Sequence, residues 1–334
     1  MVKKIFFISG FSGSDALDEL RDGIRNNQDR YKIINESTNK NVHYTLKIEN
    51  QEQLEEIEII NIIWQDLLYD TQPDKLGFLE KTALFFYWAK RSFVKKCFAS
   101  KNKAMISNIF INGAILLIWY LSFFIAVLDW GLKEFDISFF NGTFIKTSLS
   151  ITALSFLFIK SLGINIEKSI KLLFQTKRYL TENRLVSFCR GRILDEILNV
   201  EEDEKFKIVT HSFGSVIAID AIINTKNIQN KNFDLITLGS PLDFLSLRSE
   251  KIKTSLEKMV VILGNNRDKI TWNFYYSTTD WMSPDTLQLS SDNNLNTNFK
   301  AVNLEGDEGL FEKLTNKPHR KYFYNKEIIE NILL

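Results

Sequence analysis

Residues 205–220 read KFKIVTHSFGSVIAID, and this stretch decides the fold class of the 334-residue chain. The β-branched run from Phe206 to Val209 is typical of a buried strand, and apolar positions from Val216 onward recur as in a helix. The turn THSFG lies between them, with Ser212 at its centre. A strand, a sharp turn centred on a serine and then a helix is the context that lifts a serine hydroxyl above a sheet edge.

The residues around Ser212 match this kind of turn in part. Small residues two positions before and after the serine let the strand and the helix pack closely. Gly214 meets that need, whereas Thr210 stands where glycine is usual. The other interpretation is that Ser212 only caps the helix that follows.

A second glycine-rich loop follows the first predicted strand. Residues 3–9 (KKIFFIS) predict a buried strand, and residues 10–14 (GFSGS) come directly after it. Such a loop can direct backbone N–H groups at a developing oxyanion. We expect the N–H groups of Phe11 and Phe213 to form this oxyanion hole. The alternative is an ordinary strand-to-helix turn in which a residue of the loop caps the next helix.

The chain has three histidines that could serve as a base for Ser212: His43, His211 and His319. His211 adjoins the serine, so the turn directs its side chain away from the hydroxyl. His43 precedes a predicted strand over residues 44–48 and is expected at the surface or an edge. His319 lies in a loop after the last predicted strand, where it can reach over the sheet edge and accept the serine proton.

Two aspartates compete for the role of orienting that histidine. Asp280 follows the predicted strand 271–276 (TWNFYY), in a position suited to stabilise a charged imidazole. Asp243 follows the predicted strand 234–238 and the turn GSPL, and it is the less favoured candidate. The chain order with Asp280 is serine, aspartate, histidine.

Taken together, these stretches resemble the α/β-hydrolase superfamily, and serine hydrolases of the lipase and esterase type in particular. The resemblance covers residues 1–75 and 181–334, and Thr210 departs from its usual pattern. It implies a mostly parallel sheet with helices on both faces, a catalytic triad and an acyl-enzyme intermediate. The stretches that carry it are ISGFSG (8–13), THSFG (210–214), LITLGSPL (235–242), WNFY (272–275) leading to Asp280, and His319 followed by Tyr322.

The middle of the chain predicts an insertion that crosses a membrane. Residues 104–128 hold 25 positions without an Asp, Glu, Lys or Arg, which is enough to span a bilayer. Residues 147–166 contain a second apolar run that becomes long enough if its lysines extend towards the headgroups. Before them, residues 78–98 interleave aromatic and basic side chains, which suits a helix lying at a membrane interface or packed on the core.

Charge placement gives this predicted hairpin an orientation. Lysines and arginines gather before residue 104 and after residue 159, whereas Asp129, Glu134 and Asp136 lie between the two runs. By the positive-inside rule, both ends of the insertion face the cytoplasm. We therefore expect an inner (cytoplasmic) membrane location with the hydrolase core on the cytoplasmic side. The other interpretation is a pair of buried helices that cap the active site.

These signals divide the chain into three parts. Residues 1–75 are expected to form the first half of the hydrolase core, residues 76–180 the insertion, and residues 181–334 the second half. The total of 42 Lys and Arg against 41 Asp and Glu argues against a nucleic-acid partner. Cys97 and Cys189 form no metal or redox motif, and we expect no metal and no cofactor. The sequence indicates no oligomeric state.

The expected function is that of a membrane-anchored serine hydrolase. Ser212 would attack a carboxylic ester or thioester, and a lipid is the expected substrate because the site would lie beside a bilayer. Two alternatives belong to different classes. One is a soluble esterase whose apolar insertion forms a lid. The other is a non-catalytic membrane-bound interaction or effector module that retains the hydrolase fold.

Overall fold

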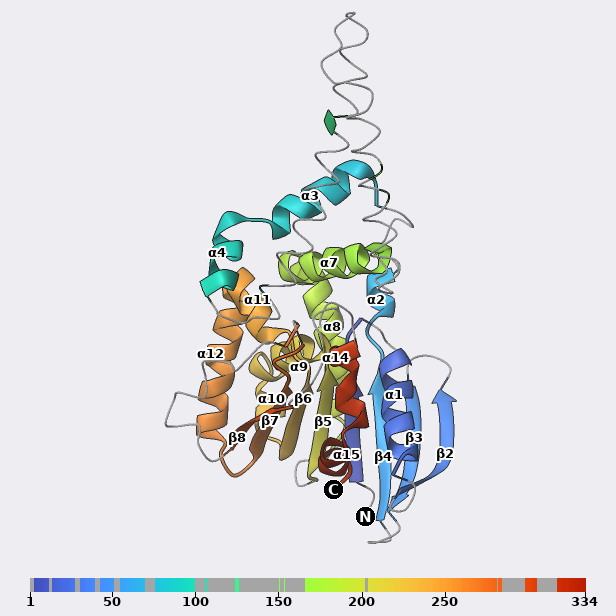
Figure 1. Ribbon diagram of the computed structural model, residues 1–334. Helices are drawn as coiled ribbons and strands as arrows, with labels where there is room; N and C mark the ends of the chain where they lie inside the picture. The colour runs from blue at the N-terminus through green and yellow to red at the C-terminus, as the bar shows by residue number, and fades with distance from the viewer. Residues whose placement is uncertain are drawn as a thin grey trace, which may run out of the picture.

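In a computed structural model of the chain, the described residues form one sheet with helices on both of its faces (Figure 1). They are 3–11, 14–27, 31–39, 43–50, 55–69, 76–99, 166–201, 204–280, 282–283, 298–304 and 317–334, with isolated positions at 106, 124–125, 150 and 153.

The described strands join in an eight-stranded sheet with the order β2-β3-β4-β1-β5-β6-β7-β8. Six consecutive strands, from β4 through β1 to β8, pair in parallel, and β3 runs antiparallel to β2 and β4. The predicted α/β class with a mostly parallel sheet is therefore confirmed. The strands are β1 (Lys3–Ile8), β2 (Tyr31–Asn39), β3 (His43–Asn50), β4 (Glu55–Ile62), β5 (Phe206–His211), β6 (Phe233–Leu238), β7 (Ile270–Tyr276) and β8 (Phe299–Asn303).

Helices cover both faces because the central strands are apolar on both sides. In β1, Phe6 and Ile8 belong to the core cluster on one face, whereas Ile5 and Phe7 belong to the cluster on the other. The second face is covered by α1 (Ser14–Arg25), the 3-10 helix η3 (Lys321–Tyr324) and α15 (Lys326–Leu333). The first face is covered by α8 (Asn183–Ile197), α9 (Gly214–Ile223), α10 (Lys226–Gln229), α11 (Leu242–Arg248) and α12 (Glu250–Asn265).

The two flanks of the insertion combine in this one sheet. Strand β1 pairs directly with β5, so that Ile5 lies opposite Lys207.

Short helices stand at the carboxyl ends of the parallel strands, and further helices lie above that end of the sheet (Figure 1). These helices are α2 (Asp66–Tyr69), α3 (Phe78–Trp88), α4 (Arg91–Ala99), α7 (Ile166–Thr181) and α14 (Lys317–Arg320).

The predicted transmembrane hairpin is wrong. No helix in the part of the chain that the structure describes is both long and apolar enough to cross a bilayer. The two predicted spans, 104–128 and 147–166, lie almost wholly outside the described residues. The prediction relied on the absence of charges, which measures composition, whereas a span also needs an unbroken apolar helix of about 20 residues. The flanking helices α4 and α7 have 9 and 16 residues and carry several lysines and arginines.

The turn between β5 and α9 is packed against the end of β1. A Cβ added to Gly214 would lie 2.0 Å from the carbonyl oxygen of Ile8 and 2.9 Å from that of Ser9. Both of these atoms belong to the backbone and cannot rotate away. Gly214 is therefore required by the close approach of two backbones.

We expect Gly214→Ala to lower the free energy of unfolding by about 3 kcal/mol or more, because the added methyl group must push β1 away from α9. The matched control is Gly191→Ala, in the middle of α8, where a Cβ meets nothing within 4 Å. That control should stabilise the protein by about 0.5–1 kcal/mol through the lower entropy of the unfolded chain. Urea denaturation of both variants measures the two effects. Equal stability of the two variants would contradict the proposed packing constraint.

Candidate active site

Ser212 sits in a strained turn at the carboxyl end of β5. Among the described non-glycine residues, Ser212 alone has a positive φ, of 56°. Its N–H donates a 2.9 Å hydrogen bond to the carbonyl of Leu238 at the end of β6, and α9 begins two residues later at Gly214. Backbone strain of this kind persists only where the surrounding structure holds it in place, and it is concentrated at functional sites.

The glycine-rich loop after β1 lies against this serine. A Cβ added to Gly10 would be 2.7 Å from Ser212 Cβ, 3.0 Å from Ser212 Oγ and 3.1 Å from the backbone nitrogen of Phe213. The serine oxygen and the nitrogen of Phe213 therefore face the same side of the Gly10 backbone. A nucleophile and an oxyanion donor need this convergence to act on one carbonyl group.

Aromatic side chains pack beside the turn. The rings of Phe11 and Phe213 lie 4.5 Å apart, and the rings of Trp64 and Tyr179 approach Phe213 to 6.0 and 5.1 Å. The structure thus brings Phe11 and Phe213, the two residues expected to form an oxyanion hole, into contact. Their neighbourhood is apolar, which strengthens any hydrogen bond made there.

Trp64 and Gln65, which follow β4, hold the loop that carries Gly10 in place through hydrogen bonds. Trp64 Nε1 donates a 2.8 Å hydrogen bond to the carbonyl of Ser9, and Gln65 Nε2 donates to the carbonyl of Gly10 at 2.5 Å and to Ser9 Oγ at 2.9 Å. Gln65 was not identified from the sequence. The available signal was its place directly after a strand that neighbours β1, where a buried amide can reach the adjacent loop.

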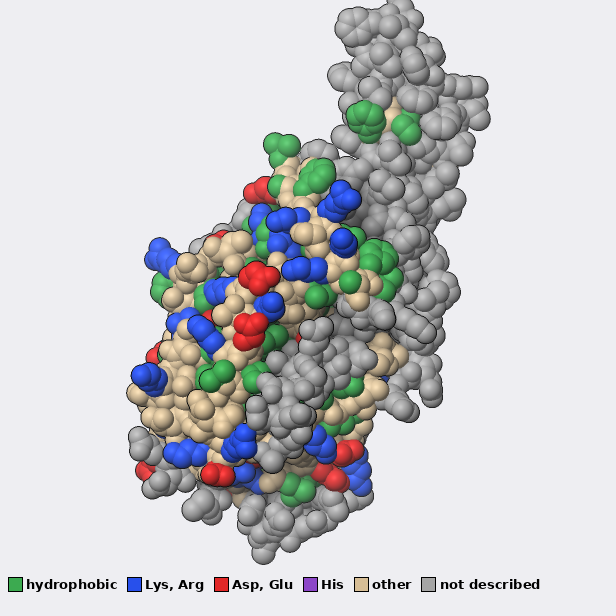
Figure 2. Space-filling view, turned by 90° about the vertical axis from the view of Figure 1, so that its left-hand side faces the viewer, with side chains coloured by type: hydrophobic (Ala, Val, Ile, Leu, Met, Phe, Trp, Pro, Cys, Tyr) green, Lys and Arg blue, Asp and Glu red, His purple; other side chains and the backbone are tan. Residues whose placement is uncertain are grey.

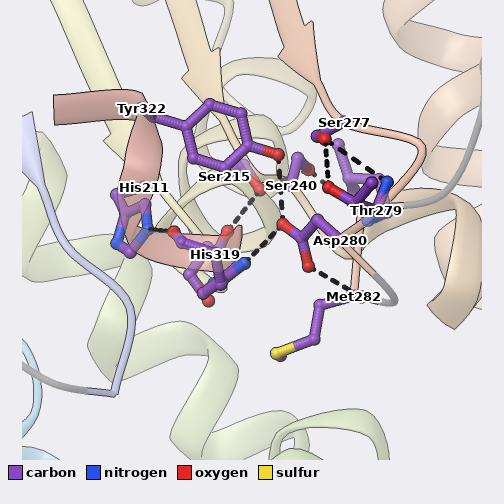
Figure 3. Close-up of polar contacts among 11 residues, drawn as sticks. His211, Ser215, Ser240, Ser277, Thr279, Asp280, Met282, His319 and Tyr322 are labelled. Carbon is purple, nitrogen blue, oxygen red and sulfur yellow. Dashed lines mark hydrogen bonds and ion pairs between the residues drawn. The ribbon is translucent and has the colours of Figure 1, made fainter. Parts of the chain in front are cut away.

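His319 and Asp280 form a buried pair at the same sheet edge (Figure 3). His319 Nδ1 lies 2.7 Å from Asp280 Oδ2, and both side chains are at most 5 % exposed. A carboxylate can only accept, so Nδ1 carries a proton, and in the neutral ring Nε2 then carries the lone pair. In the described part of the chain, His319 Nε2 is buried and has no hydrogen-bond partner. The ring therefore has the tautomer of a general base, with its acceptor nitrogen unused.

Asp280 is held by two further donors. The Tyr322 hydroxyl donates a 3.0 Å hydrogen bond to Oδ2, the oxygen that His319 also contacts, and the N–H of Met282 donates to Oδ1 at 3.0 Å. Burial, followed by the charge of Asp280, raises the pKa of Tyr322 well above its ordinary value, so this hydroxyl stays protonated and remains a donor. Three donors fix the carboxylate and, through it, the histidine ring.

The structure places the second acid candidate elsewhere. Asp243 lies in the first turn of α11, whereas the imidazole is paired with Asp280. The end of β6 supports this arrangement through Gly239, whose φ is +57°. A Cβ at Gly239 would be 3.1 Å from His319 Nδ1 and 2.7 Å from Tyr322 Cε2, so a glycine is needed for the histidine to lie against the strand end.

His211 supports His319 from the other side. Its Nε2 lies 2.9 Å from the backbone carbonyl of His319, and the two rings are 4.8 Å apart (Figure 3). Because a carbonyl only accepts, Nε2 of His211 carries the proton. Burial, followed by the charge of His319, lowers the pKa of His211 to about 3. Sequence reasoning placed this side chain away from the serine and missed its contact with the histidine.

The site is thus made from the ends of four neighbouring parallel strands. The loop after β1, Ser212 after β5, Gly239 after β6 and Asp280 after β7 meet at one edge, and α14 supplies His319. In open α/β sheets this edge is where ligands bind. Among the described residues, no group of His, Cys, Asp and Glu gathers in a way that could hold a metal ion.

Comparisons with known proteins identify no relative of the chain. No model of a protein family matches it, and searches of curated proteins and of solved structures find no match. The case for a function therefore comes from the geometry alone.

The low pKa of His211 predicts how stability changes in acid. The ordinary value of about 6.5 applies to the unfolded chain, so folding excludes a proton from His211 below that pH. The corresponding stability is fully present above pH 6.5 and is lost as the pH falls towards 3. Between pH 6.5 and 4.5, the wild type should lose roughly 2 kcal/mol more than His211→Gln, whose amide can still donate to His319.

Urea denaturation of both proteins over this pH range measures the difference. The difference in the free energy of unfolding between the wild type and His211→Gln at pH 8, where both side chains are neutral, gives the effect of packing alone. Parallel profiles for the two proteins between pH 6.5 and 4.5 would contradict a neutral, buried His211.

Proposed function

We propose that the chain is a serine hydrolase that cleaves a carboxylic ester or thioester through an acyl-enzyme on Ser212. The observation that carries this proposal is the strained backbone of Ser212, with a φ of 56°, at the sheet edge that also holds the His319–Asp280 pair. A serine that only caps a helix needs neither a positive φ nor a paired histidine nearby.

The proposed mechanism uses each group in one role. Ser212 Oγ attacks the carbonyl carbon while Nε2 of His319 takes its proton, and Asp280 keeps Nδ1 protonated and stabilises the imidazolium. The N–H groups of Phe11 and Phe213 stabilise the oxyanion. His319 then returns the proton to the departing alcohol or thiol. Water repeats the sequence on the acyl-enzyme and releases the acid.

The surroundings of Ser212 favour an apolar acyl group. The side chains of Phe11, Phe213 and Trp64 are uncharged and aromatic, and they pack beside the turn that carries the serine. Trp64 and Phe213 are already buried, whereas Phe11 is only partly buried, so an acyl group beside the turn would meet an aromatic ring and no charged partner. We therefore propose a lipid-like ester as the substrate class.

A fluorophosphonate probe tests the reactivity of the serine. The wild type should be labelled, Ser212→Ala should not be labelled, and His319→Ala should be labelled at least about 10³-fold more slowly, because the base is missing. The matched control is Ser187→Ala, which removes an exposed helix serine and should leave the labelling unchanged. Failure of the folded wild type to react would favour the non-catalytic interaction module.

The choice between the two aspartates is tested by replacing each one with asparagine. Asp280→Asn should lower kcat/KM for a p-nitrophenyl ester by about 10³–10⁴-fold, because an amide N–H facing His319 Nδ1 favours the wrong tautomer. Asp243→Asn should change the same constant by less than about threefold, and it serves as the control. The reverse order of effects would assign the orienting role to Asp243.

A further inference from the structure

Helix α3 exposes an apolar stripe. Leu79, Ala83 and Phe86 are spaced by four and three residues, which places them on one face of the helix. Leu79 is 81 % exposed and Phe86 is 66 % exposed. Large apolar side chains that are this exposed and line one face of a helix indicate a surface that binds a partner or a membrane.

Other residues of α3 anchor the helix to the rest of the protein. Leu84 is buried, Trp88 stacks on Phe244 of α11 at 6.1 Å, and Trp88 Nε1 donates a 3.3 Å hydrogen bond to the carbonyl of Leu173 in α7. The Arg248 guanidinium lies 3.8 Å above the ring of Tyr87.

Helix α4 continues this surface with positive charge. The sequence suggested a single helix over residues 78–98, but the chain forms two, and α4 packs inward through the buried Phe93 and Cys97. Its outer side presents Arg91 and Lys95 beside Phe98, which is 47 % exposed. Over residues 78–99 the exposed charges are Glu80 against Lys81, Lys90, Arg91, Lys95 and Lys96, and Lys96 pairs with Glu250 of α12 at 3.7 Å. Figure 2 shows blue basic side chains gathered among green hydrophobic ones in the upper part of the molecule.

We propose that this α3–α4 face binds the surface of an anionic phospholipid bilayer. Basic side chains next to exposed leucine and phenylalanine match a layer whose headgroups are negative and whose interior is hydrocarbon. The helices would lie along the interface, with only their side chains entering it. Helices α3 and α4 lie above the carboxyl ends of the parallel strands (Figure 1), and Ser212 directly follows the carboxyl end of β5, so binding would bring the candidate site close to lipid. The proposal concerns binding and does not depend on hydrolysis by Ser212.

Sedimentation with vesicles tests this proposal on the full chain. The vesicles are phosphatidylcholine alone, or phosphatidylcholine mixed two to one with phosphatidylglycerol. The wild type should bind the anionic vesicles at least about tenfold more tightly than the neutral ones, and added salt should weaken the binding. Arg91→Gln with Lys95→Gln should weaken anionic binding about 25-fold, at about fivefold per basic residue. Leu79→Ser should weaken it by up to about tenfold, through lost apolar contact.

Matched controls use the outer side of α12. Val261→Ser removes a side chain that is 60 % exposed, and Lys258→Gln removes an exposed lysine of the same helix; both should bind like the wild type. Ser212→Ala should also bind like the wild type, which separates this proposal from the proposed chemistry. Equal binding to neutral and anionic vesicles would overturn the proposal. That result would mean that the basic side chains of this face do not contribute and that another apolar segment adsorbs to the vesicles. Unchanged binding of the α3 and α4 variants would overturn it too, and the face would then fit an acidic protein partner better.

Discussion

The backbone contact between Gly214 and the end of β1 is the constraint on which the candidate site depends. The carbonyl groups of Ile8 and Ser9 occupy the space where any other residue would carry a Cβ. This contact holds the loop after β1 against the turn at Ser212, and Gly10 makes the reciprocal approach to the serine side chain. The proposed nucleophile and the proposed oxyanion donor are therefore positioned by two backbones. Backbone positioning is stiffer than positioning by side-chain rotamers.

Asp280 and His319, the proposed acid and base, are positioned differently, through a buried polar network. Asp280 accepts hydrogen bonds from His319, Tyr322 and the N–H of Met282, and His211 holds the backbone of His319 from behind. In an apolar interior such a network is stable only when nearly all of its members are satisfied. Two ring nitrogens of this network, Nδ1 of His211 and Nε2 of His319, are buried without a partner in the described part of the chain. Of the two, Nε2 of His319 belongs to the ring that is paired with Asp280, and it is the atom that would receive a proton in the proposed reaction.

Much of the site could be predicted from the sequence because parallel strands bring their carboxyl ends together. Once residues 3–9, 206–209 and 271–276 were identified as strands, the residues after them had to meet at one edge. The edge strand β2 was not predicted, since YKIINESTN mixes polar and apolar residues without a clear alternation. The contact of His211 with His319 joins residues 108 apart, and no local pattern reports it. The transmembrane hairpin was predicted from the absence of charged residues, and no helix among the described residues is long and apolar enough to cross a bilayer.

The position of α15 in the chain has a consequence for biosynthesis. Ile328, Ile329, Ile332 and Leu333 belong to the core cluster that covers one face of β1, although β1 is the first of the described strands in chain order. Until residues 317–334 have been translated, that face of β1 has only the part of its cover that α1 supplies, and His319 is absent from the candidate site. Domains fold as units, and exposed apolar surface on a partly made chain favours aggregation. A partly made chain that ends before residue 317 therefore leaves apolar side chains of β1 less covered and lacks the histidine of the candidate site.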